Sequence, residues 1–225
     1  MRERLTLLAL LLLGTTTASS WAAMMQISVD NFDFEADQTT GPGSTTVTGW
    51  SASKGSGIYL PAANDANPYS SAVDNARGNV AYSGSATGVI AQETDETFNP
   101  FRPYDLSVLV GYRNDSFTVF GGYAIRLAAG GETIVERRQD VRNTSGFVKG
   151  QFKEVVVRYL PDLEALPTAA GKLTIEFNAF ASQTNFDDVR LFAGDPLALP
   201  EAVPEPLAAG GLVGLAAIAL RRRRS

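Results

Sequence analysis

Short stretches in which apolar and polar residues alternate run through the middle of this chain. In residues 172–180, KLTIEFNAF, the apolar positions Leu173, Ile175 and Phe177 are separated by polar ones. An alternation with a period of two predicts a β-strand with one buried face. Other stretches are rich in Val, Ile, Tyr and Phe and are bounded by Gly, Pro, Asn or Asp, which is also typical of strands. They cover residues 79–84, 88–93, 104–112, 121–130 and 152–160.

These strands and the turns between them predict one all-β domain over residues 23–195. No stretch before residue 200 has a clear helical period, so we expect an antiparallel two-sheet jelly-roll sandwich. Two segments interrupt the strand pattern. Residues 61–79 are rich in Asn, Asp, Ala and Ser and predict a long loop, either simply solvated or functional. Residues 136–142, ERRQDVR, predict a solvated turn.

The N-terminal residues have the pattern of a secretory signal. Arg2 and Arg4 precede an apolar run, residues 5–13, which is too short to span a bilayer and is followed by small residues. This order predicts a signal peptide over residues 1–22, cut after Ala22 by signal peptidase. The alternative is an N-terminal anchor that is not cleaved.

The C-terminal residues also differ from the domain. Residues 196–202 are a proline-containing linker, and residues 207–220 are an apolar stretch. As a helix this stretch is about 21 Å long, whereas a bilayer core is about 30 Å thick, so it makes a marginal transmembrane helix. The cluster of Arg221, Arg222, Arg223 and Arg224 predicts a cytoplasmic end for residues 203–225.

The composition excludes several kinds of chemistry. The chain has no cysteine and no histidine, which excludes disulfides, a cysteine nucleophile, a Ser-His-Asp triad and the usual zinc sites. Its net charge is −5, and four of its bases lie in the terminal arginine cluster. A surface of this sign repels nucleic acid, so we expect no nucleic-acid partner. Any bound metal should be a hard cation with oxygen ligands.

Carboxylates at the two ends of the domain suggest such a site. Glu35 lies in the opening segment, VDNFDFEAD, and Asp187 in the closing one, TNFDDVRLFA. The first and last strands of a sandwich commonly lie side by side, so the two carboxylates could meet and bind Ca²⁺ together with main-chain oxygens. Plain surface charge is the alternative.

A series of short motifs runs through the domain in order and carries a resemblance. The motifs are Asn31-x-x-Phe34-Glu35, Gly49-Trp50, Asn79-x-Ala81-Tyr82, Ile90-x-Gln92 and Asn185-Phe186-Asp187-x-Val189-x-Leu191. They resemble calcium-binding jelly-roll domains of the kind found in carbohydrate-binding modules and galactose-binding-like domains, and within that group they are most similar to the cyanobacterial Stig cyclases. The resemblance implies that Glu35 and Asp187 are structural Ca²⁺ ligands, with Asn31 and Asp188 as neighbours of the site.

Aromatic residues beside polar ones suggest a second kind of site. Carbohydrate-binding sandwiches stack sugar rings on exposed aromatic faces. Tyr59 and Tyr69 flank the long loop, and Tyr112 with Asn114 stands at the end of a predicted strand. We therefore expect these four residues to bind a ligand, with ordinary core packing as the alternative for each ring. The resemblance to Stig cyclases also leaves an enzyme possible, although the sequence identifies no catalytic acid.

The tail resembles a PEP-CTERM sorting signal. Val203, Pro204, Glu205 and Pro206 precede the apolar stretch and the arginine cluster in the order that an exosortase reads. The resemblance implies an inner-membrane-anchored precursor that an exosortase cuts near the triplet, with release to the cell surface or beyond. An ordinary single-span anchor is the alternative. Together these patterns predict an exported, non-catalytic binding or structural module of an exopolysaccharide or biofilm matrix. The alternative function is a Stig cyclase-like or other calcium-dependent enzyme of the same fold.

Overall fold

The computed structural model describes residues 24–37, 43–61, 69, 78–115 and 119–197. This part of the chain is built from short, antiparallel strands. They are β1 (Met25–Ile27), β2 (Ser51–Ala52), β3 (Ser56–Tyr59), β4 (Val80–Ser83), β5 (Val89–Thr97), β6 (Tyr104–Tyr112), β7 (Tyr123–Ala129), β8 (Glu132–Gln139), β9 (Gln151–Tyr159), β10 (Lys172–Asn178) and β11 (Thr184–Ala193).

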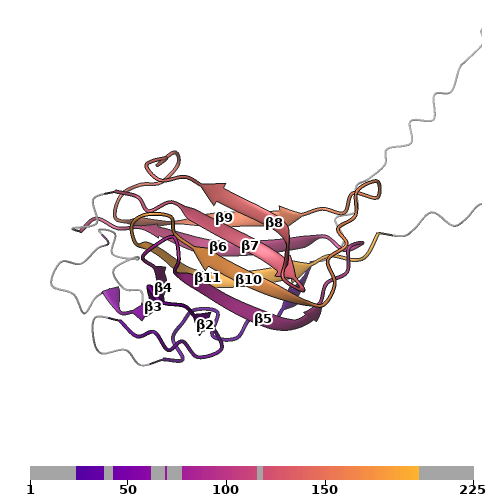
Figure 1. Cartoon of the computed structure of the whole chain (residues 1–225), viewed down its shortest axis with the longest axis horizontal. Helices are drawn as coiled ribbons and strands as arrows, with labels where there is room; N and C mark the ends of the chain where they lie inside the picture. The colour runs from indigo at the N-terminus through magenta and orange to yellow at the C-terminus, as the bar shows by residue number, and fades with distance from the viewer. Residues whose placement is uncertain (1–23, 38–42, 62–68, 70–77, 116–118, 198–225) are drawn as a thin grey trace, which may run out of the picture. The chain divides into compact units, whose positions relative to one another are not determined.

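The strands form two sheets that pack against each other (Figure 1). One sheet has six strands, in the order β3-β4-β11-β6-β9, with β1 paired to β11 beside this path. The other has five, in the order β2-β5-β10-β7-β8. Phe177 of β10 and Phe186 of β11 stack across the interface with ring centroids 4.9 Å apart. The prediction of an all-β, two-sheet sandwich is confirmed.

Alternation along the central strands places the core between the sheets. Leu173, Ile175 and Phe177 of β10 have no exposed surface, and the residues between them face outward or are partly covered. The same pattern runs through β6, which coincides with the predicted strand 104–112. Burial of apolar surface stabilises the fold by roughly 25 cal/mol per Å², so these two strands supply much of the stability.

Strand β8 corrects one prediction. Residues 136–139 of the expected turn lie in this strand, which pairs with β7 at the edge of the five-stranded sheet. Both faces of β8 are largely exposed, so the residues do not alternate between apolar and polar. An ion pair of 2.5 Å between Arg126 of β7 and Glu136 of β8 contributes to the pairing. The sequence therefore lacked the signal of a half-buried strand.

The two ends of the domain lie side by side. Strand β1 pairs with β11, with Met25 opposite Ala193 and Ile27 opposite Leu191. This confirms the expectation that the first and last strands are neighbours. A backbone hydrogen bond of 2.8 Å from the Val189 N–H to the Phe32 carbonyl continues the contact beyond β1.

A buried amide fixes the segment that follows β1. The Gln92 side chain of β5 donates to the carbonyls of Asp30 (2.9 Å) and Gly49 (2.8 Å) and accepts from the Asp30 N–H (2.9 Å). The Trp50 indole N–H donates to the same Asp30 carbonyl at 2.9 Å. The Trp50 ring packs against Phe34 and Phe177 with centroids 5.3 and 5.5 Å away. These contacts hold the N-terminal segment against the core.

The chain divides into two compact units, Met1–Asp195 and Pro196–Ser225. The sandwich lies in the first. The predicted signal peptide with its cleavage at Ala22 lies outside the described residues, as do the sorting triplet and Arg221 to Arg224. Within the described ranges, no helix is long and apolar enough to cross a bilayer.

Replacing Gln92 with Glu should destabilise the domain. The change puts an oxygen in place of the amide nitrogen, facing two carbonyl oxygens that then lose their donor. We expect a loss of about 2–4 kcal/mol in the free energy of unfolding, measured by urea denaturation. Gln151→Glu, at an exposed position of β9, is the control and should change stability little. Equal stability of the two variants would contradict the role given to Gln92.

Candidate active site on the outer face of the six-stranded sheet

The face of the six-stranded sheet that points away from the core carries a group of buried and partly buried polar and aromatic side chains. Their strand neighbours Ile58, Ala81 and Phe186 belong to the core, so alternation turns these side chains to the opposite face. We call Tyr59, Tyr69, Tyr82, Arg113, Phe152 and Asn185 the outer-face cluster. Tyr59, Tyr82, Phe152 and Asn185 lie in β3, β4, β9 and β11, Arg113 directly follows β6, and Tyr69 lies between β3 and β4.

Asn185 is the centre of this cluster. Its Oδ1 accepts hydrogen bonds from the hydroxyls of Tyr59 (3.2 Å) and Tyr69 (2.7 Å). Its Nδ2 donates to the Ala81 carbonyl at 3.3 Å. Tyr59 and Tyr69 are 3% and 1% exposed, which leaves no face on which a sugar ring could stack. The structure therefore buries both rings that were expected to form an exposed stacking platform.

A glycine makes room for Tyr69. Gly111 of β6 lies opposite Asn185 in the sheet, and a Cβ at this position would collide with the Tyr69 hydroxyl and the Phe152 ring. The Tyr69 and Phe152 rings pack with centroids 4.5 Å apart. The missing side chain at Gly111 thus lets the Tyr69 hydroxyl reach Asn185.

A buried ion pair adjoins the two phenols. Arg113 donates through two nitrogens to the carboxylate of Asp115. Its guanidinium also lies over the Tyr59 ring, 5.0 Å from the centroid. Burial raises the pKa of Tyr59 to about 12, although the positive charge of Arg113 opposes this rise. Burial also raises the pKa of Tyr69 well above its ordinary value. Both phenols therefore remain neutral hydrogen-bond donors at physiological pH.

Asp187 occupies the same face two residues further along β11. It is 5% exposed, and its Oδ1 accepts the Asp188 N–H at 2.7 Å. The pairing of β11 with β6 shifts register between Asp187 and Arg190, and Asp188 has a φ of 49°. Such a bulge redirects side chains and is common beside functional sites. The Asp188 carboxylate itself binds Arg190 at 2.8 and 3.1 Å.

Glu35 reaches the beginning of β4 from the N-terminal segment. Its carboxylate fills the space where a Cβ at Gly78 would lie. Burial raises the pKa of Glu35 and the charge of Asp33 adds to this, whereas a hydrogen bond from the Asn79 backbone lowers it. The last paired residues of β4 and β11 are Ala81 and Phe186, so Asp187 is level with Val80. The structure therefore brings both predicted carboxylates to the start of β4.

Asn31 and Asp188 have structural partners instead. The Asn31 amide donates to Asp37 (3.1 Å) and to the Thr48 carbonyl (3.0 Å), and its oxygen accepts the Ala36 N–H (2.9 Å). These bonds close the loop that carries Glu35. In the described ranges, no three or more Asp or Glu side chains group in a way that could hold a metal ion. A cation here would need main-chain oxygens besides Glu35 and Asp187.

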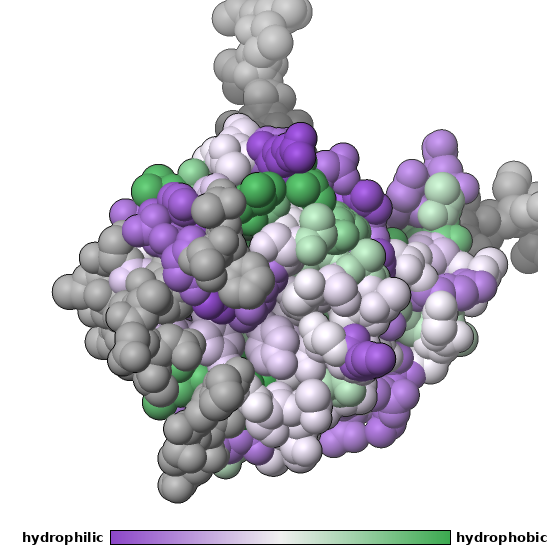
Figure 2. Space-filling view, turned by 60° about the vertical axis from the view of Figure 1, so that its left-hand side comes forward, coloured by the Kyte–Doolittle hydropathy of each residue, from purple (hydrophilic) through white to green (hydrophobic). Residues whose placement is uncertain are grey.

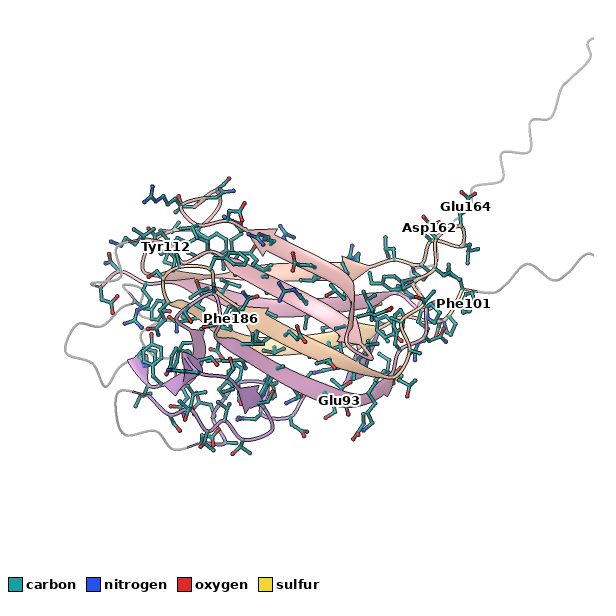
Figure 3. All side chains as sticks on the ribbon, viewed as in Figure 1. Glu93, Phe101, Tyr112, Asp162, Glu164 and Phe186 are labelled. Carbon is teal, nitrogen blue, oxygen red and sulfur yellow. The ribbon has the colours of Figure 1, made fainter. Side chains whose placement is uncertain are left out.

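Tyr112 and Asn114 lie at the end of β6, on either side of Arg113 in the sequence. The Tyr112 ring packs on Phe120 with centroids 5.2 Å apart and contacts the core, while Asn114 is exposed. Figure 3 shows Tyr112 at one end of the sandwich and Phe186 nearer its middle. Figure 2 brings this end forward, where hydrophobic and hydrophilic residues lie side by side. Of the four predicted ligand-binding residues, Tyr59 and Tyr69 thus bond Asn185 within the cluster, whereas Tyr112 packs against the core and Asn114 is exposed.

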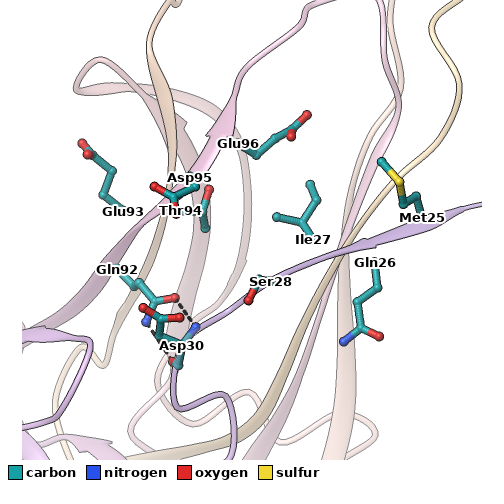
Figure 4. Close-up of a pocket in the computed structure, with 10 residues that line it drawn as sticks. All are labelled: Met25, Gln26, Ile27, Ser28, Asp30, Gln92, Glu93, Thr94, Asp95 and Glu96. Atoms are coloured by element: carbon teal, nitrogen blue, oxygen red, sulfur yellow. Dashed lines mark hydrogen bonds between the residues drawn. The ribbon is translucent and has the colours of Figure 1, made fainter.

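A cavity of about 350 Å³ opens elsewhere, between β1 and β5 (Figure 4). Its walls carry carboxylates and amides but no aromatic ring; they are formed by Met25, Gln26, Ile27, Ser28, Asp30, Gln92, Glu93, Thr94, Asp95 and Glu96. Gln92 and Asp30 form the two hydrogen bonds with each other that are described above. The outer-face cluster combines aromatic rings with polar donors, so it is the better candidate for a binding or catalytic site.

Comparisons with known proteins identify the fold and the family of this chain. The fold is that of two solved cyclase structures from Fischerella sp. TAU, each 24% identical, with 78% of this chain and 100% of the other covered. One is the Stig cyclase Fisc in complex with (3Z)-3-(1-methyl-2-pyrrolidinylidene)-3H-indole, with a TM-score of 0.61. The other is in complex with 4-(1H-indol-3-yl)butan-2-one, with a TM-score of 0.60. No curated protein matches the chain in sequence.

The chain belongs to the HpiC1-like family, described as HpiC1 cyclase, which matches residues 25–192. The expectation of a non-catalytic binding or structural module, and of a protein that is not an enzyme, was therefore wrong. The family is one of cyclases, and the match covers nearly all of the described domain. The sequence could not reveal that Tyr59, Tyr69 and Asn185 meet on one face, because the residues come from distant parts of the chain.

Proposed function

We propose that this chain is a cyclase that acts on an indole-bearing substrate at the outer-face cluster. Membership in the HpiC1-like family carries the proposal. The two Fischerella cyclase structures that share the fold hold indole compounds, which supports indole as part of the substrate.

The chemistry of the cluster suits such a reaction. Aromatic faces attract positive charge, so the rings of Tyr82 and Phe152 would stabilise a cation-like species formed during ring closure. The phenols of Tyr59 and Tyr69 stay protonated and donate their hydrogens to Asn185, so they would hold this amide in place beside the substrate. Arg113 is bound by Asp115 and lies over Tyr59, so it would hold this ring in place without presenting a net charge to the substrate.

We also propose a structural Ca²⁺ held by Glu35 and Asp187. Gly78 leaves space for the Glu35 carboxylate, and Ca²⁺ accepts main-chain oxygens to complete six to eight ligands. Asn31 and Asp188 fit this role less well because their side chains bind other groups. The ion would tie the N-terminal loop to β11 and stabilise the fold by mass action, without taking part in the chemistry.

Export and sorting complete the proposal. Signal peptidase would cut after Ala22, and an exosortase would cut the inner-membrane-anchored precursor near Pro204, Glu205 and Pro206. The cyclase domain would then act at the cell surface or outside the cell. The order of triplet, apolar stretch and arginine cluster in the sequence supports this route.

The full chain should bind 4-(1H-indol-3-yl)butan-2-one in isothermal titration calorimetry. Tyr82→Leu should weaken binding about tenfold, since an aromatic contact is worth roughly 0.5–1.5 kcal/mol beyond its buried area. Tyr112→Leu, at a partly buried tyrosine outside the cluster, is the matched control and should leave the affinity unchanged. An equal loss in both variants, or no binding to the full chain, would refute the placement of the site.

Removal of Ca²⁺ should lower the melting temperature of the full chain. At a Ca²⁺ concentration one hundred times the Kd, binding adds about 2.7 kcal/mol, which corresponds to roughly 5–10 °C for a domain of this size. Glu35→Gln should abolish the difference between Ca²⁺ and EDTA in a thermal melt. Glu93→Gln, at an exposed carboxylate of β5, should preserve the difference. Identical melting curves with Ca²⁺ and with EDTA would exclude the ion.

Mass spectrometry of the mature protein from its native host tests the sorting route. We expect an N-terminus at Ala23 and a C-terminus close to Pro204–Pro206. Replacing Glu205 with Ala should leave the C-terminal segment in place if the triplet is what the processing enzyme reads. A mature wild-type protein that retains Arg221–Arg224 would show that the tail is an ordinary anchor.

A further inference from the structure

The Asn185 amide has a hydrogen-bond donor that the described residues do not use. A carboxamide offers two N–H groups and an oxygen with two lone pairs. The oxygen is saturated by the hydroxyls of Tyr59 and Tyr69, at 3.2 and 2.7 Å. One N–H donates to the Ala81 carbonyl at 3.3 Å. In the part of the chain that the structure describes, no acceptor takes the second N–H.

Burial makes this donor significant. Asn185 has no exposed surface, and an unpaired N–H inside a protein costs stability because it has lost its bonds to water. Buried amide groups almost always have a partner, either in the protein, in an ordered water or in a ligand. The second N–H of Asn185 therefore calls for an acceptor from outside the described chain.

The orientation of the amide is fixed by its neighbours. Turning the side chain over would set its oxygen against the Ala81 carbonyl, which can only accept, so the amide nitrogen must lie on this side. Asn185 also lies on the outer face of β11, because the adjacent Phe186 belongs to the core. The remaining N–H is thus held in place within the outer-face cluster.

We propose that the second N–H of Asn185 orients the substrate by donating to a neutral acceptor such as a ketone carbonyl, an assignment that rests on the proposed cyclase function. A neutral acceptor fits better than an anion, because the nearby guanidinium of Arg113 is bound through two nitrogens to the Asp115 carboxylate. A donor group on the ligand fits poorly, since the oxygen of Asn185 already accepts two hydrogen bonds. The residue sets which functional group the site selects.

Two ligands that differ in one group test the assignment with the full chain. 4-(1H-Indol-3-yl)butan-2-one carries a ketone, and 3-butylindole has a methylene in its place. We expect calorimetry to show roughly tenfold tighter binding of the ketone, the effect of one hydrogen bond to a buried donor. Asn185→Asp keeps the acceptor for both phenols but removes the N–H, so the preference should disappear. Asn114→Asp, the same change at an exposed amide, should preserve it.

A measurement on the wild-type chain does not depend on how the variant folds. In ¹H–¹⁵N spectra, the Asn185 side-chain amide signal should move downfield with the ketone and stay in place with 3-butylindole. Equal affinities for the two ligands, or an unchanged signal with the bound ketone, would overturn the assignment and leave the cyclase proposal standing. If neither indole binds, the proposed function fails and the assignment fails with it.

Discussion

The carboxamide of Gln92 holds together the parts of the molecule on which the site depends. It bonds both backbone groups of Asp30 and the carbonyl of Gly49, so a strand of the five-stranded sheet fixes the chain just after β1. Trp50 bonds the same Asp30 carbonyl and packs into the core. From this fixed point the N-terminal loop runs to β11 and delivers Glu35 to Gly78. The three hydrogen bonds of this amide require particular directions of the backbone groups, whereas hydrophobic packing alone does not.

Strand β11 gives the sandwich its core and its candidate site at the same time. Phe186 and Leu191 point inward, while Asn185 and Asp187 point to the outer face. The bulge after Asp187 restores the inward direction at Val189, which is fully buried. Ion pairing of Asp188 with Arg190 and the bond from Val189 to Phe32 stabilise this irregular stretch. One strand can therefore carry polar residues on a nearly buried face without disturbing the core.

The tyrosines of the outer-face cluster do not form the sugar-binding platform that the sequence suggested. Tyrosines near a long loop were expected to form an exposed platform, but Tyr59 and Tyr69 are buried and direct their hydroxyls to one amide. Buried phenols stay neutral, and the rings of Tyr82 and Phe152 pack beside them. The exposed fraction of a ring depends on what packs over it, and no local sequence pattern records this.

The strands at the centre of each sheet were predictable from the sequence. In β6 and β10 the alternation is strong because one face of each is fully buried, and this is a local pattern. The motifs at the two ends also indicated correctly that β1 and β11 are neighbours. Strand β8 escaped prediction because an edge strand with two exposed faces has no alternation. The partners of Asn185 escaped it too, since the Tyr59 bond spans 126 residues. The sequence by itself determined the central strands, such as β6 and β10, and which of their side chains face the core, through local periodicity. Only the tertiary structure decided which polar groups meet, because that depends on sheet order, on register and on the space that Gly78 and Gly111 leave open.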